Sequence, residues 1–360
     1  MTMQYDLVVV GGGPAGMAAA LRAKQEGVAR ILLAEREEAL GGILRQCIHL
    51  GFGLLYFGEE LTGTEYAERF IKKIRQSSVD VLLSAAVIQL GRDGSLLLSG
   101  EKCGLVPVQA KAVILASGCR ERPVGAIPVA GTRPSGIFTA GMAQKMMNLG
   151  GYVLGEKFII LGSGDIGIIM ARQLKLFHRD VLAVIEKEDT CGGLERNRIQ
   201  CLEQYRIPLK LGCTVTEIHG QHRITGVTIK NLHNAREHFV ACDTLLVSIG
   251  LIPERELAET LAPAGQLPDW LFLCGNACYV HDAVDDVTME AEETGRLAAQ
   301  FILGTPIGRP VVPKAARPGT ESGSSLICIG CPKACALLKT EHGFIGAACG
   351  RKDPVLFRLS

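Results

Sequence analysis

Short, nearly continuous apolar runs recur along this chain, and most of them end at a glycine or an acid. Residues 7–10 (LVVV) lead into a glycine-rich turn, and residues 158–161 (FIIL) lead into another. An apolar stretch of helical length follows each turn, and a second apolar run comes next, at 31–34 and 181–185. Continuous apolar runs are typical of strands buried on both faces of a parallel sheet. The pattern therefore predicts an α/β protein built from strand–helix–strand units.

The two units are copies of one motif at a constant spacing. Both turns have the pattern Gly-x-Gly-x-x-Gly, and every position shifts by the 151 residues that separate Gly11 from Gly162. The acid that ends the next strand keeps this spacing, from Glu35 to Glu186, and so does a Gly-Gly pair that begins at Gly41. One glycine turn alone is weak evidence. Strand, turn, helix, strand and terminal acid together form the dinucleotide-binding fingerprint.

Each part of this fingerprint has a physical role. The first glycine permits the tight turn, the second lets the backbone approach a pyrophosphate, and the third lets the helix pack closely on the strand. The helix start offers N–H groups and a positive dipole end to phosphates, and the acid accepts hydrogen bonds from a ribose. The predicted cofactor contacts are Gly11, Gly13, Pro14, Ala15, Gly16, Glu35 and Gly42 in the first unit, and Gly162, Gly164, Asp165, Ile166, Gly167 and Glu186 in the second.

Two intact fingerprints predict two bound dinucleotides. The alternative is one working site and a decayed structural copy, and it is disfavoured because both copies keep all the parts. A flavin takes two electrons as hydride from a nicotinamide and passes them on singly or as a pair, so FAD with an exchanging NAD(P)H makes a redox relay. Glu186 favours the 2′-hydroxyl of NADH over the 2′-phosphate of NADPH, although Lys187 beside it weakens that preference.

Later segments complete the units. Each unit closes on a further apolar strand that ends at a glycine, and these two glycines, Gly118 and Gly250, are also predicted cofactor contacts. The first unit contains a predicted helix from about Gly63 to Arg75. Residues 270–302 predict a strand, a glycine turn and an amphipathic helix that starts near Asp286 or Val287, where two acids suit the helix N-terminus.

Composition and charge exclude several classes of protein. The 360 residues are 48% hydrophobic and 21% charged, which is typical of a well-packed globular protein. The formal net charge is +1, so no basic excess indicates nucleic-acid binding. No apolar run is long enough for a membrane span, and the N-terminus lacks the features of a signal peptide. We therefore expect a cytoplasmic protein with no membrane span and no nucleic-acid partner.

With its motifs in this order, the chain resembles the pyridine nucleotide oxidoreductase superfamily over roughly residues 1–304. Members are flavoproteins with two Rossmann-like domains, the NAD(P)-binding domain being inserted in the FAD-binding domain. The resemblance implies that the first fingerprint binds FAD and the second binds NAD(H). The implied division is residues 1–145 and 268–304 for the FAD domain, 146–267 for the NAD(H) domain, 305–325 for a Pro-, Gly- and Ser-rich linker, and 326–360 for a short Cys-rich module.

The returning strand of the FAD domain departs from the superfamily at one position. Most members have Gly-Asp there, and the acid contacts the ribityl chain of the flavin, whereas this chain has Gly275 and Asn276. An amide can also hydrogen-bond a hydroxyl, so both residues are predicted FAD contacts. The next helix would point its N-terminus at the flavin ring, where its dipole stabilises negative charge.

The superfamily's disulfide reductases carry two cysteines after the Gly-Gly pair, but only Cys47 stands there in this chain. The stretches QCIHLGFG and CGN…VHDAVD resemble instead a subgroup related to opine, proline and glycerol-3-phosphate dehydrogenases, whose flavoproteins often work beside a substrate-oxidising subunit. Cys47 is interpreted either as a reactive thiol or as a buried inert one. His49 and His281 are interpreted either as catalytic groups that move protons near the flavin or as structural hydrogen-bonders.

Four of the thirteen cysteines gather near the C-terminus, which predicts a metal site. Four thiolates in so short a span match either an iron–sulfur cluster or zinc, and unmetallated thiols are the third alternative. The segment also resembles the start of a small Cys-rich domain with the pattern CIGCPxGC, in a truncated form. The candidate ligands are Cys328, Cys331, Cys335 and Cys349.

These features lead to three functional hypotheses. The first is an FAD-dependent oxidoreductase that transfers hydride between NAD(H) and flavin and exchanges electrons with a partner dehydrogenase subunit, a small Cys-rich protein or an iron–sulfur centre. The second is a stand-alone NADH-dependent reductase of oxygen, a quinone or a disulfide. The third is a flavin-binding subunit, without catalysis of its own, in a larger dehydrogenase.

Overall fold

The computed structural model describes residues 2–261, 267–305, 336–340 and 343–348. These residues form two compact units. Unit 1 takes its described residues from Met1–Cys119 and Pro253–Ser360, and unit 2 consists of Arg120–Ile252. The chain passes between the units twice, through the paired strands β9 (Cys119–Glu121) and β19 (Leu251–Pro253).

Unit 1 is centred on a seven-stranded sheet with the order β5-β2-β1-β8-β7-β6, in which β20 also pairs with β8. The pairs β5-β2, β2-β1, β1-β8 and β8-β20 are parallel, and β7 and β6 add an antiparallel hairpin. The strands are β1 (Met3–Val10), β2 (Ile31–Ala34), β5 (Asp80–Leu82), β6 (Ala86–Leu90), β7 (Ser95–Gly100), β8 (Gly104–Leu115) and β20 (Leu271–Leu273).

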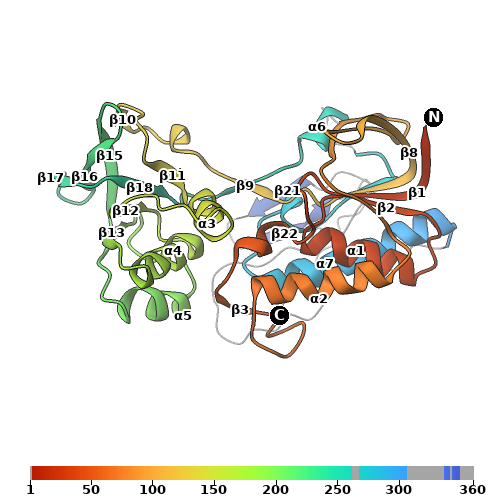
Figure 1. The fold of residues 1–360 in the computed structure, drawn as a ribbon, viewed down its shortest axis with the longest axis horizontal. Helices are drawn as coiled ribbons and strands as arrows, with labels where there is room; N and C mark the ends of the chain where they lie inside the picture. Colours follow the sequence, from red (N-terminus) through yellow and green to blue (C-terminus); the bar gives the residue numbers. More distant parts are fainter. Residues whose placement is uncertain (1, 262–266, 306–335, 341–342, 349–360) are drawn as a thin grey trace. The chain divides into compact units, whose positions relative to one another are not determined.

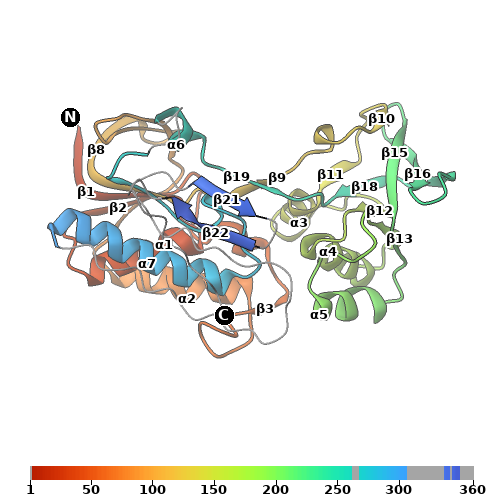
Figure 2. The same ribbon diagram turned by 180° about the vertical axis from the view of Figure 1, so that it is seen from behind.

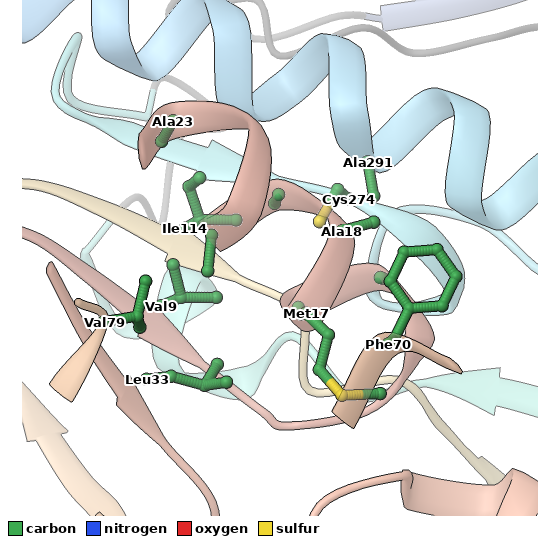
Figure 3. Packing of buried hydrophobic residues seen from close by; sticks show 14 of the residues in the cluster. Val9, Met17, Ala18, Ala23, Leu33, Phe70, Val79, Ile114, Cys274 and Ala291 are labelled. Atoms are coloured by element: carbon green, nitrogen blue, oxygen red, sulfur yellow. The ribbon is translucent and has the colours of Figure 1, made fainter. Parts of the chain in front are cut away.

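Three helices cover one face of this sheet, as Figures 1 and 2 show. They are α1 (Pro14–Gln25), α2 (Gly63–Gln76) and α7 (Val284–Leu303). Their apolar faces close a core with the sheet, and Figure 3 shows Met17, Phe70 and Ala291 of the helices in the same buried cluster as Val9 and Ile114 of the strands. Burying these side chains is the main stabilising term for the unit.

Shorter elements complete unit 1. A smaller core on the opposite face of the sheet includes Ala258 and Leu261 of α6. The remaining elements are η1 (Gly42–Gln46), β3 (Leu50–Phe52), β4 (Leu61–Thr62), α6 (Glu256–Leu261), η4 (Gly275–Ala277) and the antiparallel pair β21 (Ala336–Thr340) and β22 (Gly343–Ala348).

The sequence predicts where α2 and α7 begin, and the prediction is right for α2 but too late for α7. Helix α2 begins at Gly63, as predicted, and Thr62 and Glu65 form a reciprocal capping box at its start. Helix α7 begins at Val284, two or three residues before the predicted start near Asp286 or Val287. Ala283 is the N-cap residue, and no side chain caps this helix, Asp285 included. The Asp285 carboxylate has other partners. It is buried, and it accepts hydrogen bonds from the backbone N–H groups of Gly53 and Leu55.

Helices α1 and α7 pack closely because a glycine lies at their contact. A Cβ atom added to Gly295 of α7 would overlap the backbone oxygen of Ala19 in α1. We expect Gly295→Ala to lower the free energy of unfolding by about 2–3 kcal/mol, because the helices must separate. Urea denaturation measures this change. The control is Gly125→Ala, where an added Cβ meets no atom within 4 Å, and an equal loss in both variants would contradict the packing argument.

Unit 2 is a three-layered α/β/β assembly. Its central parallel sheet has the order β11-β18-β12-β13-β14, and a second sheet has the order β10-β15-β16-β17. Helices α3 and α4 pack on one face of the central sheet, and the second sheet packs on the other. The elements are η2 (Val124–Ala126), β10 (Ala130–Gly131), β11 (Ile137–Thr139), α3 (Ala140–Asn148), β12 (Lys157–Leu161), α4 (Asp165–Leu176), β13 (Asp180–Ile185), α5 (Glu195–Asn197), the π-helical turn η3 (Arg198–Glu203), β14 (Leu209–Lys210), β15 (Cys213–Gly220), β16 (Ile224–Asn231), β17 (Glu237–Ala241) and β18 (Thr244–Val247).

Both units thus contain the strand–turn–helix–strand arrangement that the apolar pattern predicts, β1-α1-β2 in unit 1 and β12-α4-β13 in unit 2. The Rossmann-like α/β fold class is confirmed for the described residues. None of the helices within those residues is long and apolar enough to cross a membrane.

Candidate functional site

The first glycine turn connects β1 to α1 at the carboxyl edge of the unit 1 sheet. Two of its glycines are required by the protein's own packing. Gly11 has a φ of +108°, and an added Cβ there would overlap the carbonyl oxygen of Ala116, while one on Gly16 would overlap the carbonyl oxygen of Gly11. Gly13 differs, since a Cβ there would meet only the Cα of Gly42, at 3.9 Å. Protein packing therefore does not explain the absence of a side chain at Gly13.

The second glycine turn connects β12 to α4 in unit 2 and repeats this arrangement. An added Cβ on Gly162 would overlap the carbonyl oxygen of Ser248, and one on Gly167 would lie 2.6 Å from the carbonyl oxygen of Gly162. The nearest atom to a Cβ on Gly164 is Ser248 Oγ, at 3.8 Å. Of the three glycines in each turn, only the middle one would take a Cβ without overlapping another protein atom. Its missing side chain leaves room for a phosphate to approach the backbone closely.

The two terminal acids hold their turns by the same hydrogen bonds. In unit 1, the N–H of Gly12 donates to Glu35 Oε2 at 2.6 Å, and the N–H of Glu37 donates to Oε1 at 2.8 Å. In unit 2, the N–H of Ser163 donates to Glu186 Oε2 at 2.9 Å, and the N–H of Glu188 donates to Oε1 at 3.1 Å. Each carboxylate keeps lone pairs for a further donor, such as a ribose hydroxyl.

The helix starts differ in how their first residues are used. Both N-caps are glycines, Gly13 and Gly164, so no side chain caps α1 or α4 and the first-turn N–H groups remain available to an anion. Pro14 occupies the first position of α1. In α4 the Asp165 carboxylate turns towards the following loop, where it accepts hydrogen bonds from the N–H of Leu194 and the side-chain amide of Asn197, each at 2.8 Å.

The other predicted contacts lie near these turns. Ala15 lies against Gly275, since a Cβ added to Gly275 would lie 2.8 Å from Ala15 Cβ. Gly42 lies against Gly13 in the same way, since a Cβ added to Gly42 would lie 2.9 Å from Gly13 Cα. Ile166 lies in the first turn of α4 and is half-buried. Gly118 and Gly250 follow the ends of β8 and β18, and an added Cβ meets nothing within 4 Å at Gly118 and only Arg122 Nε, at 4.0 Å, at Gly250.

Cys47 follows η1 in unit 1 and is buried. Burial raises the pKa of its thiol from an ordinary value near 9 to about 12, and the Sγ atom donates to the backbone oxygen of Ile43. At neutral pH this thiol is protonated and shielded, which favours the inert of the two interpretations. His49 is half-buried nearby, its Nδ1 atom lies 3.0 Å from the backbone oxygen of Leu50, and its ring packs against Phe52.

We therefore expect Cys47 to resist alkylation by iodoacetamide in the folded protein up to about pH 10, because both burial and the raised pKa oppose thiolate formation. Mass spectrometry of tryptic peptides measures the modified fraction, and alkylation after unfolding in urea supplies the matched control. Rapid modification of Cys47 at pH 8 in the folded state would contradict the inert interpretation.

His281 lies in a buried polar cluster formed by the segment that follows strand β20 and by helix α7. Its Nε2 atom lies 2.6 Å from Glu290 Oε2, and its Nδ1 atom lies 3.1 Å from Asn276 Oδ1. The other oxygen of Glu290 accepts a hydrogen bond from the N–H of Gly275 at 3.0 Å. The side chains of His281 and Glu290 are only 4% and 2% exposed, and the ring of Tyr279 stacks on His281.

Two buried acids of unit 1 were not predicted from the sequence to have buried partners. Glu290 and Asp285 are acids on the buried side of α7, among apolar neighbours such as Val287 and Ala291. An acid inside the apolar stripe of a helix is the signal that could have identified them, because buried carboxylates need partners. The four candidate metal ligands, Cys328, Cys331, Cys335 and Cys349, lie outside the described residues. Within those residues no group of three or more His, Cys, Asp or Glu side chains could hold a metal ion.

Comparison with known proteins identifies the family. The family model for pyridine nucleotide-disulphide oxidoreductases matches residues 5–266. The chain therefore belongs to this family and is an FAD- and NAD(P)-dependent oxidoreductase, with a fold that binds FAD and a pyridine nucleotide.

Individual relatives are more distant. The hydrogen cyanide synthase subunit HcnB of Pseudomonas protegens is 28% identical over 342 residues, which cover 84% of this chain and 71% of HcnB. An alkyl hydroperoxide reductase subunit of Staphylococcus aureus is 23% identical, over 79% of this chain and 54% of the relative. The chain thus spans between about half and seven tenths of the length of such relatives.

Solved structures share the fold. Thioredoxin reductase from T. acidophilum has a TM-score of 0.65 at 20% identity, and the match covers 84% of this chain and 98% of the reductase. The NAD-dependent persulfide reductase of A. fulgidus has a TM-score of 0.60 at 23% identity, with 86% and 60% covered. At these identities the likeness concerns the fold alone.

Proposed function

We propose that unit 1 binds FAD, that unit 2 binds NAD(H), and that the protein exchanges the electrons with a partner dehydrogenase subunit or an iron–sulfur centre. The observation that supports this proposal is the matched pair of glycine turns. In each, the first and third glycines are needed by the protein itself, and the middle one, Gly13 or Gly164, borders open space. This is the cradle that a pyrophosphate fits, and it occurs once in each unit.

The chain's own residues have binding and orienting roles in this proposal. The N-termini of α1 and α4 would face the two pyrophosphates with their dipoles, and Glu35 and Glu186 would accept ribose hydroxyls while keeping their backbone hydrogen bonds. Gly118, Gly275 and Asn276 would border the flavin nucleotide, and Gly250 would border the nicotinamide nucleotide. Bound FAD supplies the two-electron acceptor for hydride from NADH.

The preference for NADH rests on Glu186. The residue is 9% exposed, and its carboxylate is held by two backbone N–H groups and the Ser163 hydroxyl, so it cannot swing away from an incoming 2′-phosphate. A fixed carboxylate repels that phosphate and accepts a hydrogen bond from a 2′-hydroxyl. Lys187 beside it is exposed and pairs with Glu188 at 3.1 Å.

The proposed partner is a second, substrate-oxidising subunit. Two relatives, HcnB and the alkyl hydroperoxide reductase protein, are named as subunits, which supports a shared electron path. A dithiol relay just after the first Gly-Gly pair is disfavoured, because only Cys47 stands there and its thiol is buried. The same proposal includes a metal site, for an iron–sulfur cluster or zinc, whose candidate ligands are Cys328, Cys331, Cys335 and Cys349. We further propose a cytoplasmic location.

The test is to purify the protein, identify the released flavin by mass spectrometry, and follow the protein's colour after NADH is added without air. The proposal predicts FAD, bleaching, and a bleached state that persists until an electron acceptor is added, either the partner dehydrogenase together with its oxidised substrate or an artificial acceptor. Rapid recolouring in air would favour the alternative, a stand-alone reductase of oxygen. If NADH does not bleach the bound flavin, the result would favour the third hypothesis, a flavin-binding subunit without catalysis of its own.

A further inference from the structure

Asn276 lies between the proposed flavin site and the buried pair formed by His281 and Glu290. It follows Gly275 after strand β20, and the amide of Cys274 just before it donates to Leu115 at the end of β8. A Cβ on Gly275 would touch Ala15 in the first turn of α1, so this segment borders the glycine turn of unit 1. The side chain of Asn276 is half-buried, and its Nδ2 atom lies 3.5 Å from Cys119 Sγ, next to Gly118.

The orientation of the Asn276 amide is fixed by His281. Oδ1 accepts a hydrogen bond from the backbone N–H of His281 at 3.0 Å and faces the ring Nδ1 atom at 3.1 Å. A flipped amide would set its NH2 group against two donors, this backbone N–H and the ring Nδ1–H, so both contacts oppose the flip and loss of the ring weakens this restraint. Nδ2 must therefore point away from His281, on the side of Cys119 and Gly118.

Glu290 fixes His281 in turn. Its Oε2 atom lies 2.6 Å from Nε2, and Oε1 is held by the N–H of Gly275. Asn276 Oδ1 can only accept, so a hydrogen bond between it and the ring requires Nδ1 to be the donor. Burial of both side chains strengthens these hydrogen bonds and prevents water from competing for them.

We propose that His281 and Glu290 are positioning residues that make Asn276 a hydrogen-bond donor towards bound FAD. A carboxylate at this position would only accept, whereas the Asn276 NH2 group has two hydrogens: one is donated to Cys119 Sγ, and the other is offered to an acceptor such as a phosphate or ribityl oxygen. The inference rests on FAD binding to unit 1. It assigns His281 a role through Asn276 rather than a direct part in proton transfer to substrate.

Two substitutions at one position separate this role from simple packing. An asparagine side chain can place its NH2 near the position of Nδ1, and a glutamine can place its NH2 near that of Nε2. His281→Asn therefore keeps the contact with Asn276, and His281→Gln keeps the contact with Glu290. We expect the FAD dissociation constant to rise about tenfold in His281→Gln and to stay within about threefold of the wild type in His281→Asn.

A double-mutant cycle tests whether His281 acts through Asn276. Asn276→Ala should weaken FAD binding about tenfold, and adding His281→Gln should weaken it no further, because the donor is already lost. FAD affinity is measured by titrating apoprotein and following the quenching of flavin fluorescence. Thermal unfolding of each apoprotein shows whether the variant folds. If His281→Gln does not fold, Asn276→Asp decides, since a carboxylate there removes the donor and should also weaken FAD binding about tenfold.

The outcomes are distinct. Independent, additive losses, or a larger loss in His281→Asn than in His281→Gln, would overturn the positioning role. Unchanged FAD affinity in Asn276→Ala or in Asn276→Asp would overturn the donor, while FAD binding by the wild type would keep the proposed function intact. A wild-type apoprotein that binds no FAD would instead remove the proposed function itself.

Discussion

Gly13→Ala is expected to fold like the wild type and to bind FAD about a hundredfold more weakly, a change of about 2.7 kcal/mol. The nearest protein atom to the new methyl group would be Gly42 Cα, at 3.9 Å, which is ordinary contact. The methyl group would instead occupy the space where the pyrophosphate approaches the backbone, so charge-assisted hydrogen bonds from the start of α1 would lengthen. Fluorescence titration of the apoprotein with FAD measures the change.

Gly16→Ala in the same turn is the matched control. There the added methyl group would overlap the carbonyl oxygen of Gly11, so the substitution should lower the midpoint of thermal unfolding of the apoprotein, which Gly13→Ala should not do. If Gly13→Ala bound FAD as tightly as the wild type, the unit 1 turn would not be the pyrophosphate site. If it unfolded like Gly16→Ala, the packing argument would be wrong.

The corresponding change in unit 2 should separate the two nucleotides. In Gly164→Ala the new methyl group would lie 3.8 Å from Ser248 Oγ, so we expect the fold and the bound flavin to be retained. The apparent dissociation constant of NADH should rise at least about tenfold, because the methyl group would take the space of the second pyrophosphate. Stopped-flow absorbance, with flavin reduction recorded at increasing NADH concentration and without air, measures this value.

A maximum rate of flavin reduction close to that of the wild type, reached only at higher NADH concentration, would indicate a binding defect alone. Loss of flavin from Gly164→Ala would contradict the assignment of one nucleotide to each unit. Gly167→Ala serves as the control for stability, because its methyl group would lie 2.6 Å from the carbonyl oxygen of Gly162.

The sequence predicts the two turns well because their requirements are local. The strand, the three glycines and the acid lie within about one strand–helix–strand unit, and the constant spacing between the copies shows that the same parts are present twice. The capped start of α2 at Thr62 is local in the same way. Periodicity and capping motifs depend on residues a few positions apart, which a sequence displays directly.

The features that the sequence does not reveal depend on distant contacts. Asp285 is a residue type that favours helix starts, yet its carboxylate accepts a hydrogen bond from the backbone N–H of Gly53, and α7 begins earlier than predicted. The pairing of His281 with Glu290 requires the loop after β20 to fold back on α7. Similarly, the pKa of the Cys47 thiol is raised because the folded chain buries it, and the sequence alone does not show that burial.

The central claim is that each unit holds one dinucleotide and that the two work as a redox pair. Anaerobic titration of the FAD-loaded protein with NADH, followed by flavin absorbance, tests this claim most directly. We expect one FAD for each chain and complete bleaching as NADH is added, with NADPH less effective. A protein that stays colourless after incubation with excess FAD, or a bound flavin that neither NADH nor NADPH reduces, would contradict it.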